Sequence, residues 1–321
     1  MDLIYMNSAM EDIGVLMDYE LDLAFGADEN DFECQIQKES HCCEAGFYLY
    51  IEGTEYGGII DSIKIDTAIN RITYSGRTWH GMLDSKVLEP NSGQAYLTVT
   101  GEANEIIASL LSRMGLSDMF EASSVDSGIN VNSYQMNRYI TGYSGITKML
   151  DSVGAKLQFT FRDRKVILSA VTKRDYTQED EFDSDNVDFI LKKKYNTVNH
   201  LVCLGRGELA ERTVIHLYTD ADGNVSRTQT FHGLEECAAV YDYPSAESEE
   251  ELINGGTEQL KSLMTNTDLI IDCDSESDSF DVGDVVGAYD NATAISVASA
   301  IRKKIVSIKN GQIIIQYKVG E

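Results

Sequence analysis

Two short glycine-containing motifs carry residue types that could bind a nucleotide or activate a serine. Residues 205–210, Gly-Arg-Gly-Glu-Leu-Ala, match the G-x-G-x-x-A spacing of dinucleotide sites and follow a predicted strand. Such a site needs a helix next, because the helix N-terminus binds the pyrophosphate, but the residues that follow alternate like a strand. Residues 142–145, Gly-Tyr-Ser-Gly, precede Ile146, where a nucleophile elbow needs its second glycine. Neither motif predicts a catalytic residue or a cofactor.

The acidic residues and histidines offer only weak candidates for metal ligands. The segments 220–231 and 272–283 begin with alternating acidic or amide residues, as calcium loops do. In the first segment, however, Val225 replaces the turn glycine and Phe231 the bidentate glutamate, and the second lacks both features. The five histidines form no HxxxH or HExxH pair: His41, His80, His200, His216 and His232. We expect turns with solvated carboxylates, with incidental divalent binding as the alternative, and histidines that are packed or exposed polar residues.

The charge balance removes whole classes of function. The 321 residues include 53 Asp and Glu against 26 Lys and Arg, a formal net charge of −27. Nucleic acids and anionic membranes are held by clustered cations, so both are disfavoured as bound partners. Because 43% of the residues are hydrophobic, the acidity belongs to a folded protein of several domains.

The N-terminus and the cysteines indicate a protein made in a cytoplasm. No cationic and apolar secretory signal is visible, and the apolar runs are shorter than the roughly 18 residues that span a bilayer. Six thinly spread cysteines form no disulfide framework, so we expect reduced thiols.

The elements that must position any site begin with a β-rich segment. Short apolar or alternating runs separated by Gly, Asn and Asp predict strands. These strands are Asp2–Met6, Tyr19–Phe25, Phe47–Ile51, Ile59–Asp66 and Arg71–Ser75. Five or more strands at such close spacing predict a small barrel or sandwich.

The middle of the chain changes to helical periodicity. Residues 100–115 predict a helix capped by Thr100 or Gly101 and ended by Gly115, and residues 143–155 predict another with Ser144 as N-cap. Two strands follow, Lys156–Phe161 and Lys165–Val171, and then an acidic stretch over 177–189 that we expect to be a solvated loop.

The C-terminal part returns to strands. Hairpin turns are predicted at 222–224 and at Asn310-Gly311, with one helix over about 245–264 between them, although Gly255-Gly256 weakens its continuity. The apolar phase shifts across Arg302–Lys304, which predicts a β-bulge. The expected fold class is α+β, mainly β.

Three segments resemble a known family. They are Tyr19–Ile36, Tyr74–Pro90 with its Gly-Arg-x-Trp and Gly-x-Leu-Asp, and Phe280–Gly320. In this order they resemble the baseplate or tail hub proteins of long-tailed bacteriophages and prophages.

The resemblance implies a fold and a structural role. It implies a first β-barrel over 1–88, an α+β domain over 89–195 and a second β-barrel domain over 196–321. Three chains would form a homotrimeric ring of six barrels that adapts the hexameric tail tube to a threefold tip. The location is then the virion tail tip, after synthesis in the host cytoplasm. The implied partners are a tail tube or distal tail protein, the tape-measure protein, and a spike or fibre-bearing protein.

The candidate residues are structural, with no catalytic residue, cofactor or metal among them. Trp79 is expected in the core, with a subunit interface as the alternative. The other candidates are Gly76, Arg77, Gly81, Gly283, Asp284 and Gly287. The glycines are expected at turns or bulges, and Asp284 is expected to bind nearby backbone amides, with a subunit-contact role as the alternative. His80 departs from the family pattern and receives no role.

The net charge fits passage of DNA through a hub. An acidic channel would not retain phosphates, so we expect DNA to pass without being bound, although solubility explains much of the same charge. The chain stops directly after its last predicted hairpin, so any lytic function is expected on another polypeptide.

Two other functions stay open. One is a tail-associated cell-wall hydrolase or peptidase, whose carboxylate pair the sequence does not single out. The other is a carbohydrate-binding β module.

Overall fold

A computed structural model describes residues 1–178, 182–183, 189–193, 197–246, 248–264, 267–273, 280–293 and 295–319. The chain divides into two compact units. Unit 1 comprises Met1–Phe189 and Ile270–Val319, and unit 2 comprises Ile190–Leu269 with Gly320–Glu321. Unit 1 is therefore made of two stretches that are separated in the sequence by unit 2. Of the acidic stretch 177–189, only residues 177–178, 182–183 and 189 are described, and residues 182–183 are a strand rather than part of a loop. Residues 274–279, half of the segment 272–283, lie outside the described residues.

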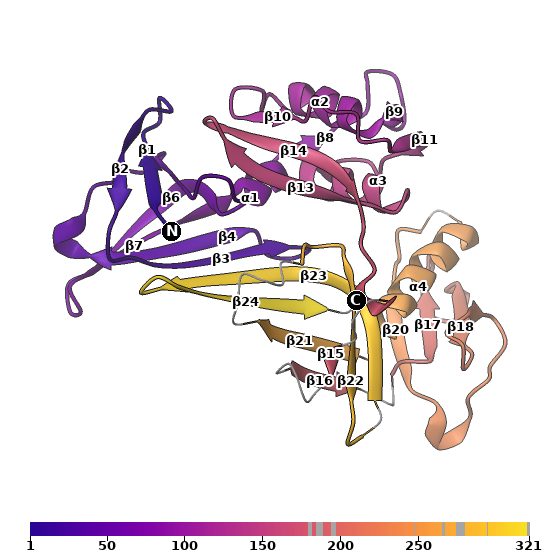
Figure 1. The fold of residues 1–321 in the computed structure, drawn as a ribbon. Coiled ribbons are helices and arrows are strands. Elements are labelled where there is room, and N and C mark those ends of the chain that lie inside the picture. Colours follow the sequence, from indigo (N-terminus) through magenta and orange to yellow (C-terminus); the bar gives the residue numbers. More distant parts are fainter. Residues whose placement is uncertain are drawn as a thin grey trace. The chain divides into compact units, whose positions relative to one another are not determined.

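One long sheet dominates unit 1, and its strands come from both ends of the chain (Figure 1). The described path runs β24-β23-β3-β4-β7-β6-β5-β1-β2. Its strands are β1 (Leu3–Met6), β2 (Asp12–Leu16), β3 (Glu20–Gly26), β4 (Asp31–Gln37), β5 (Tyr48–Tyr50), β6 (Gly57–Asp66), β7 (Arg71–Thr78), β23 (Ile295–Lys309) and β24 (Gln312–Val319). β22 (Val285–Asp290) pairs with β23 and with β15 (Phe182–Asp183). β16 (Phe189–Lys193) and β21 (Thr267–Cys273) lie where the chain passes between the units.

These strands confirm the mainly β, α+β class, and the predicted N-terminal strands are all present. The sequence did not predict that β23 pairs with β3, from Lys303 opposite Gly26 to Lys309 opposite Glu20. The described strands form an open path that ends at β2, so two closed barrels are not confirmed. The boundaries at residues 88 and 195 stay a prediction.

The helices of unit 1 pack with three smaller sheets of described strands. These elements are α1 (Trp79–Asp84), β8 (Val87–Leu88), β9 (Thr98–Glu102), α2 (Ala103–Arg113), β10 (Phe120–Ala122), β11 (Asn130–Gln135), β12 (Ile140–Thr141), α3 (Gly142–Asp151), β13 (Ala155–Arg162) and β14 (Lys165–Thr172). The sheets are β10-β14-β13, β11-β9 and β12-β8. A continuous apolar core joins Trp79 and Tyr50 to α2, α3, β13 and β14. This core ties the middle of the chain to the N-terminal sheet.

Both predicted N-caps in this region are wrong by one to three residues. Glu102 caps α2, because its carboxylate accepts the Glu105 amide at 2.9 Å. Thr141 caps α3, because its hydroxyl accepts the Ser144 amide at 3.3 Å, so Ser144 is the donor and not the cap. An N-cap must reach an amide two or three residues ahead, and these two side chains do so.

The C-terminal hairpin confirms two predictions. β23 and β24 pair from Lys309 opposite Gln312, and the turn residues Asn310 and Gly311 both have positive φ, as a type I′ turn requires. The register shifts between Ile301 and Lys303, so Arg302 is the extra residue of the predicted bulge.

Unit 2 is a small sheet with a helix packed on one face. Its elements are β17 (His200–Leu204), β18 (Val214–Thr219), β19 (Val225–Ser226), β20 (Ala238–Asp242) and α4 (Glu249–Leu263). The hairpin at 222–224 is confirmed. The helix is continuous through Gly255-Gly256, and a Cβ at Gly256 would lie 2.5 Å from Cys203 Sγ, so this glycine lets the helix approach the sheet.

Two of the three histidines of unit 2 form a hydrogen-bonded chain with Glu236. His200 Nδ1 lies 2.5 Å from Glu236 Oε1, and His200 Nε2 lies 2.8 Å from His216 Nδ1. Among the described residues no group of three His, Cys, Asp or Glu side chains is arranged to hold a metal ion. No described helix is long and apolar enough to cross a membrane.

Gly76 illustrates how tightly the main sheet is built. It lies opposite the register shift between Ile60 and Ser62, so its predicted bulge position is confirmed. A Cβ there would lie 1.9 Å from the carbonyl oxygen of Ile59. We expect Gly76→Ala to lower the free energy of unfolding by about 3 kcal/mol, because β6 or β7 must shift. Ser75→Ala, one residue away, is the control and should change it by less than about 0.5 kcal/mol in urea unfolding. Equal effects of the two variants would contradict this account.

Candidate functional site

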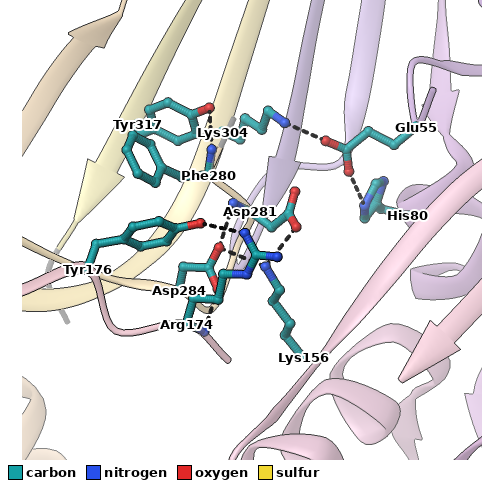
Figure 2. A network of polar contacts seen from close by, with 10 residues as sticks. All are labelled: Glu55, His80, Lys156, Arg174, Tyr176, Phe280, Asp281, Asp284, Lys304 and Tyr317. Carbon is teal, nitrogen blue, oxygen red and sulfur yellow. Dashed lines mark hydrogen bonds and ion pairs between the residues drawn. The ribbon is translucent and has the colours of Figure 1, made fainter. Parts of the chain in front are cut away.

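A network of charged and aromatic side chains connects three stretches of unit 1 that are distant in the sequence (Figure 2). Glu55 and His80 come from the N-terminal stretch, residues 156–176 from the middle, and residues 280–317 from the C-terminal strands. The network forms two neighbouring clusters, each centred on one buried lysine.

Lys156 is the centre of the first cluster. Its side chain is only 6% exposed, and its Nζ lies 2.7 Å from both Asp281 Oδ2 and Asp284 Oδ2. An isolated buried cation would cost several kcal/mol, so these carboxylates are what allow β13 to bury a lysine here. The pairs join β13 to the turn that precedes β22.

Asp284 also binds the backbone. Its Oδ1 accepts the Arg174 amide at 3.0 Å, and its Oδ2 accepts the Asp281 amide at 3.0 Å. The expectation that Asp284 binds nearby amides is therefore confirmed. Gly283, directly before Asp284, has a φ of +101°, which confirms its predicted turn position. A residue with a side chain rarely adopts this φ.

Lys304 is the centre of the second cluster. Its Nζ lies 2.7 Å from Glu55 Oε1, and 5.6 Å and 6.0 Å from the ring centroids of Tyr56 and Tyr317. Burial opposes its ionisation, but Glu55 and the two tyrosines outweigh burial and raise the pKa of Lys304. Lys304 therefore stays a cation, held by one carboxylate and two aromatic faces.

His80 lies beside this second cluster as a neutral ring. It is 3% exposed and packs between Phe25 and Phe159, with ring centroids 4.8 Å and 3.7 Å away. Its Nε2 is 3.6 Å from Glu55 Oε2, too far for a hydrogen bond. Burial, aided by the charge of Lys304, lowers the pKa of His80 to about 3.

We expect His80 to make unit 1 less stable as the pH falls from about 6.5 towards 3. In that window the unfolded chain binds a proton at His80 and the folded chain does not, because the folded pKa is the lower one. The free energy of unfolding should fall by up to about 1.4 kcal/mol per pH unit from this group. Urea unfolding between about pH 4 and 6 should give a smaller slope for His80→Phe than for wild type. His232→Phe, at an exposed position, is the control, and equal slopes for all three proteins would contradict the assignment.

Trp79 and Arg77 lie at the junction of β7 and α1. Trp79 is fully buried in the core, with its ring stacked on Phe161 at a centroid distance of 5.3 Å. Arg77 forms two 2.8 Å contacts with Asp61, one from Nε and one from Nη2, and these hydrogen bonds hold the pKa of Asp61 below its ordinary value. Both residues therefore stabilise this junction within one chain.

Two glycine predictions need correction. Gly81 lies within α1 and not at a turn or bulge, and a Cβ there would be 2.1 Å from the carbonyl oxygen of Asn30. Its role is to let the helix approach Asn30, which directly precedes β4. Gly287 lies in regular pairing opposite Ala298, because β22 runs unbroken from Val285 to Asp290.

The sequence found part of this site. It singled out Asp284 and Gly283, but it missed Lys156, Glu55 and Lys304. One signal was present for Lys304, which shares the even-numbered phase of the buried residues Val306 and Ile308 and so must face the core. Both buried lysines have carboxylate partners, so the arrangement is suited to holding segments together.

No protein-family model matches the sequence. No curated protein matches it either. Solved structures do match the fold over nearly the whole chain. The tail protein from Neisseria meningitidis MC58 has a TM-score of 0.54 at 12% identity, covering 100% of this chain and 96% of that one. The 43 kDa tail protein of prophage MuSo2 from Shewanella oneidensis has a TM-score of 0.58 at 10% identity, with 99% and 98% covered.

The chain has the fold of phage tail proteins. A third structure agrees, the prophage tail protein gp18 from Listeria monocytogenes EGD-e, with a TM-score of 0.51 at 9% identity and 99% and 94% covered. The tail-protein fold thus extends over both units and includes the segments that carry the polar network.

Proposed function

We propose that this chain is a structural protein of a phage or prophage-derived tail, and specifically the hub at the tail tip. The observation that carries the proposal is the fold match to three tail proteins. In each case the match covers at least 94% of the tail protein's length. The three sequence segments that resemble tail hub proteins support the same role. In this role the chain is not an enzyme.

The polar network suits a part that bears load. Two buried lysines join the N-terminal, middle and C-terminal stretches of unit 1 through carboxylates from other segments. Removing one partner of a buried pair is costly, so such contacts resist separation of the segments. A hub must keep its shape while a tail assembles on it.

The finer proposal is a homotrimeric ring in which each chain contributes two barrel-like parts. The ring would lie between a tail tube or distal tail protein and a spike or fibre-bearing tip, with the tape-measure protein inside. With a net charge of −27 per chain, its channel would be acidic and would let DNA pass without retaining it.

Mass measurement of the purified full chain tests the trimer. The expected result is a species of three times 35.6 kDa. An electron-microscopy map of the intact particle should place three copies at the tail tip around an acidic channel. A basic or neutral channel lining would contradict the DNA-passage part, and release of fragments from purified peptidoglycan would contradict the non-enzymatic role.

A further inference from the structure

A pocket of about 440 Å³ opens in unit 1 beside the polar network. Its walls come from α3, from β13, from the turn at 282–283 and from the start of the bulge in β23. Four cationic residues line it, namely Lys148, Lys156, Lys173 and Arg302, and we call it the cation pocket. Asp151 is the only acidic residue among its described lining residues. The chain as a whole carries twice as many acids as bases, so this local excess of cations is unusual for it.

Two of the four cations have carboxylate partners in the described chain. Lys156 is paired with Asp281 and Asp284, and Lys173 with Asp151. The side chains of Lys148 and Arg302 are exposed and make no ion pair or hydrogen bond with another described residue. The pocket therefore presents two cations that can meet carboxylates from outside.

The β-bulge gives Arg302 its place. As the extra residue of β23 it has no partner in β24, and its carbonyl oxygen accepts the Ala27 amide at 3.0 Å. A bulge redirects one side chain while the strand continues. The backbone of Arg302 is thus held at the end of β3, and its side chain is left at the pocket.

A second surface of unit 1 has the complementary character. β2 pairs only with β1 among the described strands, and it carries no Lys, Arg or Pro, the residues that commonly protect an edge strand. Every second residue from Ile13 is apolar and exposed: Ile13 and Val15 in β2, and Met17 directly after it, are 51%, 44% and 72% exposed. The exposed acids Glu11 and Asp18 flank β2 in the chain, and the exposed Asp2 precedes Leu3, which pairs with Leu16; we call this surface the acidic edge.

We propose that the cation pocket receives the acidic edge of a second copy of this chain. The inference rests on the proposed homotrimer, because a cyclic trimer needs two different surfaces that fit each other. Copies with a charge of −27 repel, so they need local sites where carboxylates meet cations. The pocket also offers Ala27, Leu157 and Val282 as apolar lining for the apolar residues of the edge. β2 and α3 lie far apart in unit 1, so one chain cannot fill its own pocket (Figure 1).

Charge reversal in the full chain tests the proposal. K148E/R302E should raise the concentration for half-assembly of the trimer at least about tenfold, measured by analytical ultracentrifugation. D2K/E11K should weaken assembly in the same way. K64E/K261E is the matched control for K148E/R302E, because it makes the same change in net charge at two exposed lysines outside both surfaces. Circular dichroism checks that each variant is folded.

The decisive variant is the fourfold exchange K148E/R302E/D2K/E11K. It reverses both surfaces, so the contact is again complementary and the trimer should return to within about threefold of the wild-type midpoint. A wild-type trimer that K148E/R302E weakens no more than K64E/K261E overturns this inference and leaves the hub proposal standing. A fourfold variant as weak as the twofold ones also overturns it. A wild-type chain that stays monomeric overturns the homotrimer itself and the inference with it.

Discussion

Asp284→Asn should lower the free energy of unfolding of unit 1 by about 3–5 kcal/mol, although it only replaces one carboxylate oxygen by an NH₂ group. The carboxylate of Asp284 accepts three donors: Lys156 Nζ and the Asp281 amide on one oxygen, and the Arg174 amide on the other. An asparagine must turn its NH₂ group towards one of these donors. A donor then faces a donor, and the positive charge of Lys156 loses its buried partner.

Asp281→Asn provides the matched control for this prediction. Asp281 contacts the same Nζ at the same 2.7 Å, but its side chain is 27% exposed, against 1% for Asp284. Water can replace part of what it supplies, so we expect a loss of about 1 kcal/mol or less. The single tryptophan, Trp79, lies in the core of unit 1, and its fluorescence in urea therefore reports this unit. Equal losses for the two variants would show that burial does not decide the strength of the pair.

Local periodicity explains what the sequence could predict. The strands, the hairpin turn at Asn310-Gly311 and the bulge at Arg302 each depend on residues within a few positions of one another. Two glycine predictions are local as well, the end of a helix near Gly115 and the turn at Gly283, because both glycines have positive φ. Such features are set by backbone conformation and by the alternation of side chains.

Long-range pairing explains what the sequence could not predict. Nothing local indicates that β23 lies beside β3, nearly three hundred residues earlier in the chain, as the pairing of Lys303 with Gly26 shows. The network depends on this pairing, because Glu55 reaches Lys304 only once both ends of the chain share one sheet. Asp284 was singled out through its turn, whereas Lys156 lies in an ordinary alternating strand and gave no signal.

The predictions that needed correction also concern features that long-range contacts decide. Ser144 was a reasonable N-cap by residue type, yet the cap is Thr141, because the position at which the chain enters the helix decides which hydroxyl meets an amide. Gly81 has the residue type of a turn, but it lies in a helix that must approach Asn30 closely. Residue type was correct in both cases, and the tertiary contact determined its use.

Glu55→Gln should be the second strongly destabilising change, with a loss of about 3–5 kcal/mol in the free energy of unfolding of unit 1. The side chain of Lys304 is 4% exposed, and Glu55 is the carboxylate that binds it. Its two tyrosine neighbours carry no charge at neutral pH, and each aromatic face contributes about 2 kcal/mol to a desolvated cation. Without Glu55, Lys304 must stay charged in a poor environment or give up its proton.

Lys304→Met separates the loss of a partner from the loss of the network. Methionine fills a similar volume without a charge, so Lys304→Met alone should cost less than Glu55→Gln, within about 2 kcal/mol of wild type. In the double variant Glu55→Gln/Lys304→Met the uncompensated cation is gone, and most of the stability lost in Glu55→Gln should return. Urea unfolding, monitored by Trp79 fluorescence, gives the free energy of unfolding of the wild type, the two single variants and the double variant. If the two losses simply add in the double variant, the buried charge of Lys304 is not the cause, and the second cluster holds unit 1 together by packing alone.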